Sequence, residues 1–204
     1  MTAPHLSADA LHAPTRPAGS ETSAAWLATG FRPFFLLAAG FAVFAMPAWL
    51  LTLFTGVRVG GSAGAMHWHA HEMLFGFTTA VVAGFLLTAV ARWTSRETAS
   101  GPMLGVLAAV WLAGRLAVLT ESSLPGWLVA AIDLAFLPML AVVLARPIVA
   151  SRNRRNYAFV GIVAALWALD LAGHLEGFGI VDGWRREGEC GESRKQREAH
   201  ERIS

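Results

Sequence analysis

The chain has 204 residues, of which 55% are hydrophobic and 15% charged, with a formal net charge of +2. Soluble domains carry about a quarter charged residues, so this composition excludes an ordinary soluble protein and indicates a membrane protein. The single Cys190 excludes a disulfide framework within the chain and any cysteine-based metal site. No basic face or motif accompanies the small positive charge, and we expect no nucleic-acid partner.

The two ends of the chain differ in composition from its body. Residues 1–24 are rich in Ala, Pro, Ser and Thr and lack an apolar core, which predicts a disordered tail and not a cleavable signal peptide. At the other end, 12 of the 30 charged residues fall in the last 24 positions. The body, 25–178, is therefore more apolar than the average and is the predicted transmembrane region.

Five apolar stretches follow one another along this body. Each has 18 to 24 residues, close to the ~20 that a helix needs to cross about 30 Å of hydrocarbon. A buried soluble helix can mimic one such stretch, but five in succession predict an all-α, polytopic transmembrane helix bundle. The spans are expected at about 31–54, 69–91, 103–120, 127–145 and 157–175.

Proline and small residues add detail to these helices. Pro47 and Pro138 lie inside their spans and predict kinks, because proline removes a helical N–H and crowds the preceding turn. Gly76, Ala80 and Gly84 recur at every fourth position of the second span. This repeat predicts a flat stripe for close helix packing.

The distribution of basic residues predicts the orientation. With the N-terminus cytoplasmic, the outer loops hold Arg58 alone, whereas eight arginines collect on the cytoplasmic side. An excess of Lys and Arg in cytoplasmic loops is the usual pattern of membrane proteins. The eight are Arg16, Arg32, Arg92, Arg96, Arg146, Arg152, Arg154 and Arg155.

The charged segment 179–204 fits this topology poorly. After five spans it lies outside, yet it carries Arg185, Arg186, Arg194, Lys195, Arg197 and Arg202. Its abrupt change in composition leads to the hypothesis that it arises from a frameshift or from the misread end of a longer gene. The alternative is a genuine solvated tail, and the genomic DNA beyond Glu176, read in three frames, distinguishes the two.

Seven ionisable side chains fall within or at the ends of the predicted spans, where each costs about 2.5–3.5 kcal/mol on insertion into the bilayer. The spans alternate in direction, yet in the predicted topology all seven residues lie in the outer half of the membrane. This gathering predicts one shared site or water-filled vestibule. The residues are His69, His71, Glu72, Arg115, Asp133, Asp170 and His174.

Three of the seven histidines of the chain lie within five residues, at His67, His69 and His71. Neutral imidazole is a ready ligand for haem iron, copper or zinc. On a regular helix His67 and His71 share a face and His69 points away, so one metal ion cannot take all three unless the helix start is frayed. A further ligand would come from His174. The alternative is a wet helix end that Trp68 anchors at the headgroups.

The charged residues have both a site interpretation and a structural one. Asp170 precedes His174 by four residues on the same face, where its carboxylate can hold the imidazole tautomer. Arg115 can form a packing ion pair with Asp133 or Asp170, or pair with a haem propionate. Glu72 is either a site residue or a helix N-terminal carboxylate favoured by the helix dipole.

Several sequence segments resemble those of a known family. They are FRPFFL at 31–36, WHAHEMLFG at 68–76, AGFLLTA at 83–89, RNRRNY at 152–157 and HLE at 174–176. These segments resemble the NnrS family, from about Ala25 to Glu176. Its members are larger polytopic membrane proteins, reported to contain haem and copper and associated with denitrification and the response to nitric oxide.

The resemblance implies a multi-pass protein of the bacterial inner membrane that binds haem and copper and protects against nitrosative stress. Its partners would be the lipid bilayer and nitric oxide or a related small molecule. The family motif carries over to His69, His71 and Glu72, and also to His174, as site residues. His67 lies outside the motif, and Asp170 stands where the family pattern has Asn. The chain corresponds to an N-terminal portion of the larger members.

Three functional hypotheses follow from the sequence. The first is a haem- or copper-binding protein of the nitric oxide response with His69, His71 and His174 as ligands. The second is a transporter or channel-like bundle in which the polar groups line a proton or solute path. The third is an inactive fragment of a larger family member. Whether the chain is an enzyme stays open.

Overall fold

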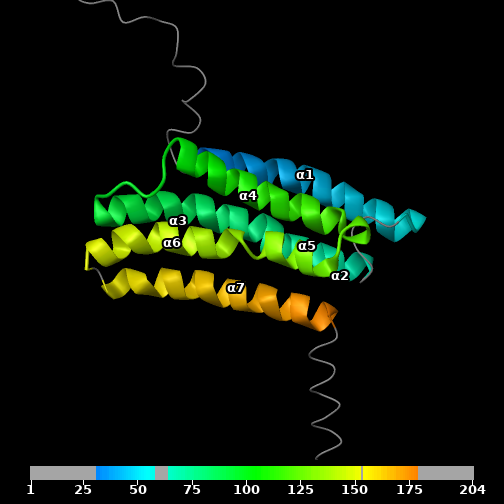
Figure 1. Ribbon diagram of the computed structural model, residues 1–204. Coiled ribbons are helices and arrows are strands. Elements are labelled where there is room, and N and C mark those ends of the chain that lie inside the picture. Colours follow the sequence, from blue (N-terminus) through cyan, green and yellow to red (C-terminus); the bar gives the residue numbers. More distant parts are fainter. Residues whose placement is uncertain (1–30, 58–63, 153, 179–204) are drawn as a thin grey trace, which may run out of the picture.

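The computed structural model describes residues 31–57, 64–152 and 154–178. Within these residues all regular structure is helical, and the long helices lie roughly side by side along one direction (Figure 1). Five helical spans are long and apolar enough to cross a membrane. The predicted all-α class and the number of spans are therefore confirmed.

Two spans are single helices and three are composite. The second span joins three consecutive helical segments, and the fourth and the fifth join two each. The second span begins four residues earlier than predicted, and the fourth ends five residues later. The bounds are α1 Phe31–Thr55, α2 Ala65–His71, η2 Glu72–Thr78, α3 Thr79–Thr94, α4 Pro102–Leu119, η3 Glu121–Ser123, α5 Gly126–Asp133, α6 Phe136–Ala150, η4 Arg154–Asn156 and α7 Tyr157–Gly177.

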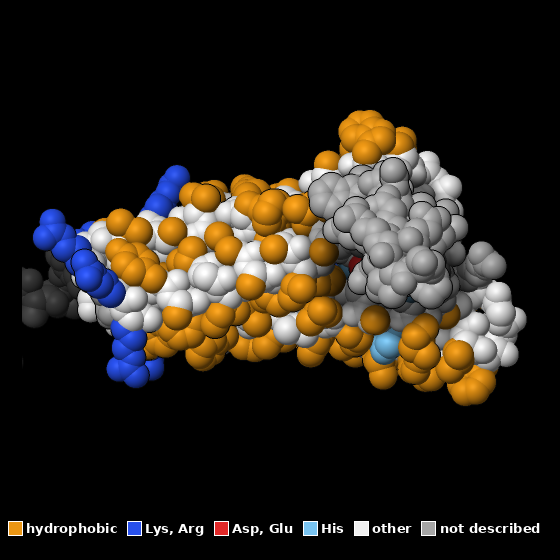
Figure 2. All heavy atoms as spheres, turned by 90° about the horizontal axis from the view of Figure 1, so that it is seen from below, with side chains coloured by type: hydrophobic (Ala, Val, Ile, Leu, Met, Phe, Trp, Pro, Cys, Tyr) orange, Lys and Arg blue, Asp and Glu red, His pale blue; other side chains and the backbone are white. Residues whose placement is uncertain are grey.

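The helices pack in the order α1, α3, α6 and α7, with α4 against α5 and α6 (Figure 1). Phe34, Leu87, Leu107 and Leu140 are fully or almost fully buried where these helices meet. Large apolar side chains also cover much of the outer surface (Figure 2). An apolar exterior around an apolar interior suits a bundle surrounded by lipid.

Small residues let the second span lie in the centre of the bundle. Gly76, Ala80 and Gly84, the predicted stripe, are all buried, and α3 packs against both α1 and α6. Small side chains allow helix backbones to approach closely, which supplies packing contacts where lipid removes the usual hydrophobic driving force.

Pro138 interrupts the fourth span, as predicted. Because its nitrogen carries no hydrogen, it leaves the carbonyl of Leu134 without the usual helical donor. The indole N–H of Trp167 on α7 donates to this carbonyl at 3.2 Å. The interruption makes Asp133 the last residue of α5. At Pro47, by contrast, α1 continues as one helix.

The two ends of the bundle differ in charge. Apart from Arg115, every arginine among the described residues lies at one end, where Figure 2 shows the basic side chains, and we call this the arginine end. It comprises Arg32, Arg92, Arg96, Arg146, Arg152, Arg154 and Arg155. The predicted orientation rests on this uneven distribution of arginines between the two ends. The cytoplasmic location of the arginine end stays a prediction.

Candidate metal centre

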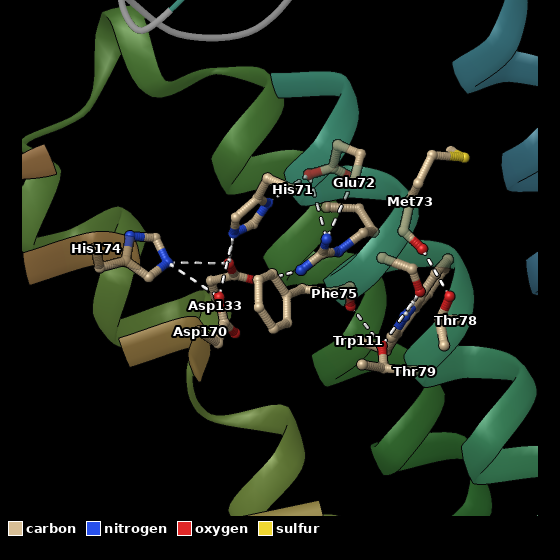
Figure 3. A network of polar contacts seen from close by, with 12 residues as sticks. His71, Glu72, Met73, Phe75, Thr78, Thr79, Trp111, Asp133, Asp170 and His174 are labelled. Carbon is tan, nitrogen blue, oxygen red and sulfur yellow. Dashed lines mark hydrogen bonds and ion pairs between the residues drawn. The ribbon is translucent and has the colours of Figure 1, made fainter. Parts of the chain in front are cut away.

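Six of the seven predicted polar residues converge toward the end of the bundle opposite the arginine end. They come from four separate spans, and Figure 3 shows most of them pointing toward one another. Their carboxylates and guanidinium are at most 6% exposed, and the two imidazoles are partly buried. We call this group the polar cluster: His71, Glu72, Arg115, Asp133, Asp170 and His174.

Two imidazoles and two carboxylates form the centre of the polar cluster. Nε2 of His71 lies 3.2 Å from Oδ1 of Asp170 and 3.3 Å from Oδ2 of Asp133. Nε2 of His174 lies 3.1 Å from the same Oδ2 of Asp133 and 3.8 Å from Oδ1 of Asp170. The Nε2 atom of each imidazole therefore faces both aspartates.

These separations match those of ligands around one metal ion. Nitrogen and oxygen ligands bind zinc-like ions at about 2.0–2.2 Å, which puts neighbouring ligands of a tetrahedral site about 3.4 Å apart. One ligand atom from each of the four residues lies within 4.8 Å of all the others. The centre of the polar cluster can hold a metal ion.

Hydrogen bonds between neutral imidazoles and the carboxylates explain only some of the close contacts in the centre of the polar cluster. A neutral imidazole carries one N–H, so each Nε2 can donate one proton at most while it faces two carboxylates. A cation among the four atoms would interact with all of them at once. The donor set therefore suits a shared cation as well as it suits the two hydrogen bonds.

Arg115 ties the centre to the second span. Its Nη1 lies 3.2 Å from each carboxylate oxygen of Glu72, and its Nη2 donates to Oδ1 of Asp133. The guanidinium thus spans two carboxylates from different spans, which suits its planar fork of donors. The prediction of an Arg115–Asp133 pair agrees with this contact.

The charges of the polar cluster do not balance. Three carboxylates and one guanidinium leave two negative charges in excess when both imidazoles are neutral. Buried charge without a counterion is strongly unfavourable, above all in a protein surrounded by hydrocarbon. A divalent cation, or two protonated imidazoles, would neutralise the polar cluster.

Two glycines make room for the ion pairs. A Cβ added to Gly76 would lie 2.9 Å from Nη1 of Arg115 and from Oε2 of Glu72, and one added to Gly114 would lie 2.9 Å from Oδ1 of Asp133. Both glycines are buried. Only hydrogen fits at these positions, so they let Arg115 and Asp133 approach the neighbouring backbone.

A wide helical turn begins within the polar cluster. The segment η2 is π-helical, a form that often occurs at functional sites. Side chains donate to carbonyls of this turn: the hydroxyl of Thr78 donates to the carbonyl of Met73 at 2.8 Å, and the indole N–H of Trp111 donates to that of Gly76 at 3.1 Å (Figure 3). Trp111 and Gly114 are site-supporting residues that the sequence did not single out, although both lie within four residues of Arg115.

The structure does not bring His69 into the polar cluster. Its ring stacks on Trp49 of α1, with ring centroids 4.2 Å apart. His67 and His69 belong to α2, which is a regular α-helix, so the frayed start that would let three histidines share a metal ion is absent from this segment. His71 and His174 are the predicted histidines that meet, and their ring centroids lie 5.6 Å apart.

Two structural interpretations change. Glu72 is 1% exposed and lies seven residues inside a continuous helical span, so the interpretation as a helix N-terminal carboxylate is wrong. It failed because the span begins at Ala65. Asp170 was expected to hold His174, but its Oδ1 lies nearer to Nε2 of His71, at 3.2 Å against 3.8 Å.

The polar cluster does not fit a haem. The cavity that His71 and His174 line has a volume of about 130 Å³, well below the ~300–1,000 Å³ of pockets for drug-sized ligands. A larger apolar cavity of about 400 Å³ between α1 and α4 reaches Glu72 and Arg115. The described residues that line it include no His, Cys, Met or Tyr to serve as an axial ligand.

Comparison with known proteins identifies the family. The sequence model of the family described as NnrS protein matches residues 25–189. No curated protein and no solved structure matches the chain. The family match begins where the resemblance begins and includes every residue of the polar cluster. Because it covers most of the sequence, the chain belongs to the NnrS family.

Proposed function

We propose that this chain is a metal-binding membrane protein of the nitric oxide response, in which His71, Asp133, Asp170 and His174 hold one divalent transition-metal ion. Membership of the NnrS family supports the link to the nitric oxide response, at the level of the family. The observation that carries the metal site is the set of four ligand atoms, all within 4.8 Å of one another, in a cluster with two negative charges in excess when both imidazoles are neutral.

The donor set favours oxidised copper. Imidazole suits copper, zinc, iron and nickel, whereas Cu(I) prefers sulfur ligands, and none of the four residues supplies sulfur. Among first-row divalent ions, sites of nitrogen and oxygen ligands generally bind Cu²⁺ most tightly. We therefore propose Cu(II) as the ion, in agreement with the copper that the family resemblance implies. Haem is not part of this proposal, because neither cavity fits it.

The residues around the four ligands have supporting roles. Arg115 orients Asp133 and balances part of its charge, and Glu72 holds the guanidinium from the other side. Hydrogen-bonded partners of this kind fix ligand orientation and tune metal affinity. A bound transition-metal ion would supply a coordination position for nitric oxide or a similar small molecule. The arginine end would face the cytoplasm of a bacterial inner membrane.

The proposal is tested by purifying the full chain in detergent, loading it with Cu(II), removing weakly bound metal and measuring the copper content. We expect one copper ion per chain in the wild type and a large loss of copper in Asp133→Asn and His174→Ala. Copper content that is equally low in the wild type and in these variants would refute the proposal.

The excess charge also supports a second candidate, a proton or solute path. Two protonated imidazoles would neutralise the polar cluster as well as a divalent ion does. In this case transport in proteoliposomes would be lost in Asp133→Asn and would not depend on added metal. An inactive fragment, the third hypothesis, would show neither property and would be degraded rapidly in the membrane.

A further inference from the structure

The cavity beside the polar cluster reaches from the two imidazoles to the ends of several helices. His71 and His174 line its inner part. Glu121 follows the end of α4 and Gly177 ends α7, and both line its outer part. The cavity therefore connects the proposed metal ion with the end of the bundle opposite the arginine end.

The size of this cavity limits what it can hold. Its volume of about 130 Å³ is well below the ~300–1,000 Å³ of pockets for drug-sized ligands. The space thus suits a ligand of a few non-hydrogen atoms and excludes drug-sized organic molecules.

The charges around the cavity limit the sign of its ligand. Glu121 lines it, and Asp133 and Asp170 lie directly behind the imidazoles. Arg115, the cation of the polar cluster, is already paired with two carboxylates. With a divalent ion bound the polar cluster is neutral as a whole, so an anion would lose its hydration beside Glu121 without meeting a net positive charge, which is unfavourable in such surroundings.

One face of α7 forms one wall of this cavity. Asp170, Gly173, His174 and Gly177 follow one another at the spacing that places residues on the same helix face. A Cβ added to Gly173 or to Gly177 would meet nothing within 4 Å. The missing side chains therefore leave open space next to the proposed ligands, and Gly173 directly precedes His174.

We infer that this cavity is the ligand chamber of the metal centre, that it selects small uncharged molecules over anions and over larger molecules, and that Gly173 keeps it open. The inference rests on the proposed metal site and adds to it the class of ligand and a residue that determines specificity. Gly173 does not bind the metal ion, so its substitution acts on access to the ion.

The experiment uses the full chain loaded with Cu(II) and follows its optical and electron paramagnetic resonance spectra as ligands are added. The probes are nitric oxide, azide, which is small but anionic, and 4-phenylimidazole, which is uncharged but much larger. We expect nitric oxide to change the spectra and azide and 4-phenylimidazole to act at least about tenfold more weakly. Gly173→Ala, Gly173→Val and Gly173→Leu should weaken the nitric oxide response stepwise while copper content stays constant.

A matched control lies on the same helix. Gly161 is also a residue of α7 without any atom near an added Cβ, but it does not line the cavity. Gly161→Leu should keep both copper and the nitric oxide response. Three results would overturn the inference. The first is an equal response to azide and nitric oxide, and the second is an unchanged nitric oxide response in Gly173→Leu. The third is a loss of copper together with the nitric oxide response across the Gly173 series. Absence of copper from the wild type would instead refute the proposed metal site.

Discussion

Trp167 on α7 donates its indole N–H to the carbonyl of Leu134, the group that Pro138 leaves without a helical donor, at 3.2 Å. This contact joins two spans at the break that ends α5. Asp133 directly precedes Leu134, and Asp170 follows Trp167 by three residues on α7. The hydrogen bond therefore helps set the distance between the two aspartates of the proposed metal centre.

Trp167→Phe should lower the stability of the bundle and loosen the position of α7 relative to the break in the fourth span. Removing the donor leaves the carbonyl of Leu134 unsatisfied, which costs about 1–3 kcal/mol. We expect a lower thermal unfolding temperature in detergent and a weaker copper affinity. Trp127→Phe is the control, because Trp127 is 67% exposed and its loss should change neither quantity. Equal effects of the two substitutions would contradict this role of Trp167.

Arg115→Gln should be the most destabilising change in the polar cluster. It leaves Glu72 and Asp133 buried without their cation, and breaking a buried pair in this way costs about 3–5 kcal/mol. Unfolding in detergent measures the loss. Arg115→Lys keeps the positive charge but not the planar guanidinium that contacts both carboxylates. Its loss of stability should therefore be smaller than that of Arg115→Gln but not zero.

A double variant separates charge from packing at this position. If the cost of Arg115→Gln comes from the unpaired carboxylates, adding Glu72→Gln removes one of them and should cost less than the sum of the two single changes. Additive losses would show that the Glu72–Arg115 pair does not act as a unit.

Gly76→Ala should disturb the ion pairs through sterics alone. The new methyl group would lie 2.9 Å from Arg115, Glu72 and Phe41, and overpacking of this kind typically costs about 1–3 kcal/mol. Gly105→Ala on α4 is the control, since nothing lies within 4 Å of its added Cβ. Unfolding should show a loss for the first variant and no loss, or a small gain, for the second. The same stability for both would contradict the close approach at Gly76.

The sequence allowed the spans to be predicted, because hydrocarbon thickness fixes the length of an apolar helix. The break near Pro138 was also predictable, since proline acts locally. The π-helical turn was not, because EMLFGFT at 72–78 carries no signal for the extra residue per turn. The meeting of Glu72 with Arg115, and of Asp170 with His71, depends on the rotation and tilt of helices far apart in sequence, which periodicity leaves undetermined.

His69 illustrates this limit. The family motif and the local density of histidines favour His69 and His71 equally, and only the rotation of α2 separates them. In the structure one ring stacks on Trp49 and the other faces the two aspartates. Whether His69 binds a metal ion stays a prediction of the resemblance, and the proposed centre does without it.

Pulsed electron paramagnetic resonance of the Cu(II)-loaded chain tests the central claim most directly, because it counts the imidazole nitrogens coordinated to copper. The account predicts two coordinated imidazoles in the wild type and in His69→Ala, and one in His71→Ala and in His174→Ala if copper is retained. Loss of an imidazole signal in His69→Ala, or an unchanged count in both His71→Ala and His174→Ala, would contradict it.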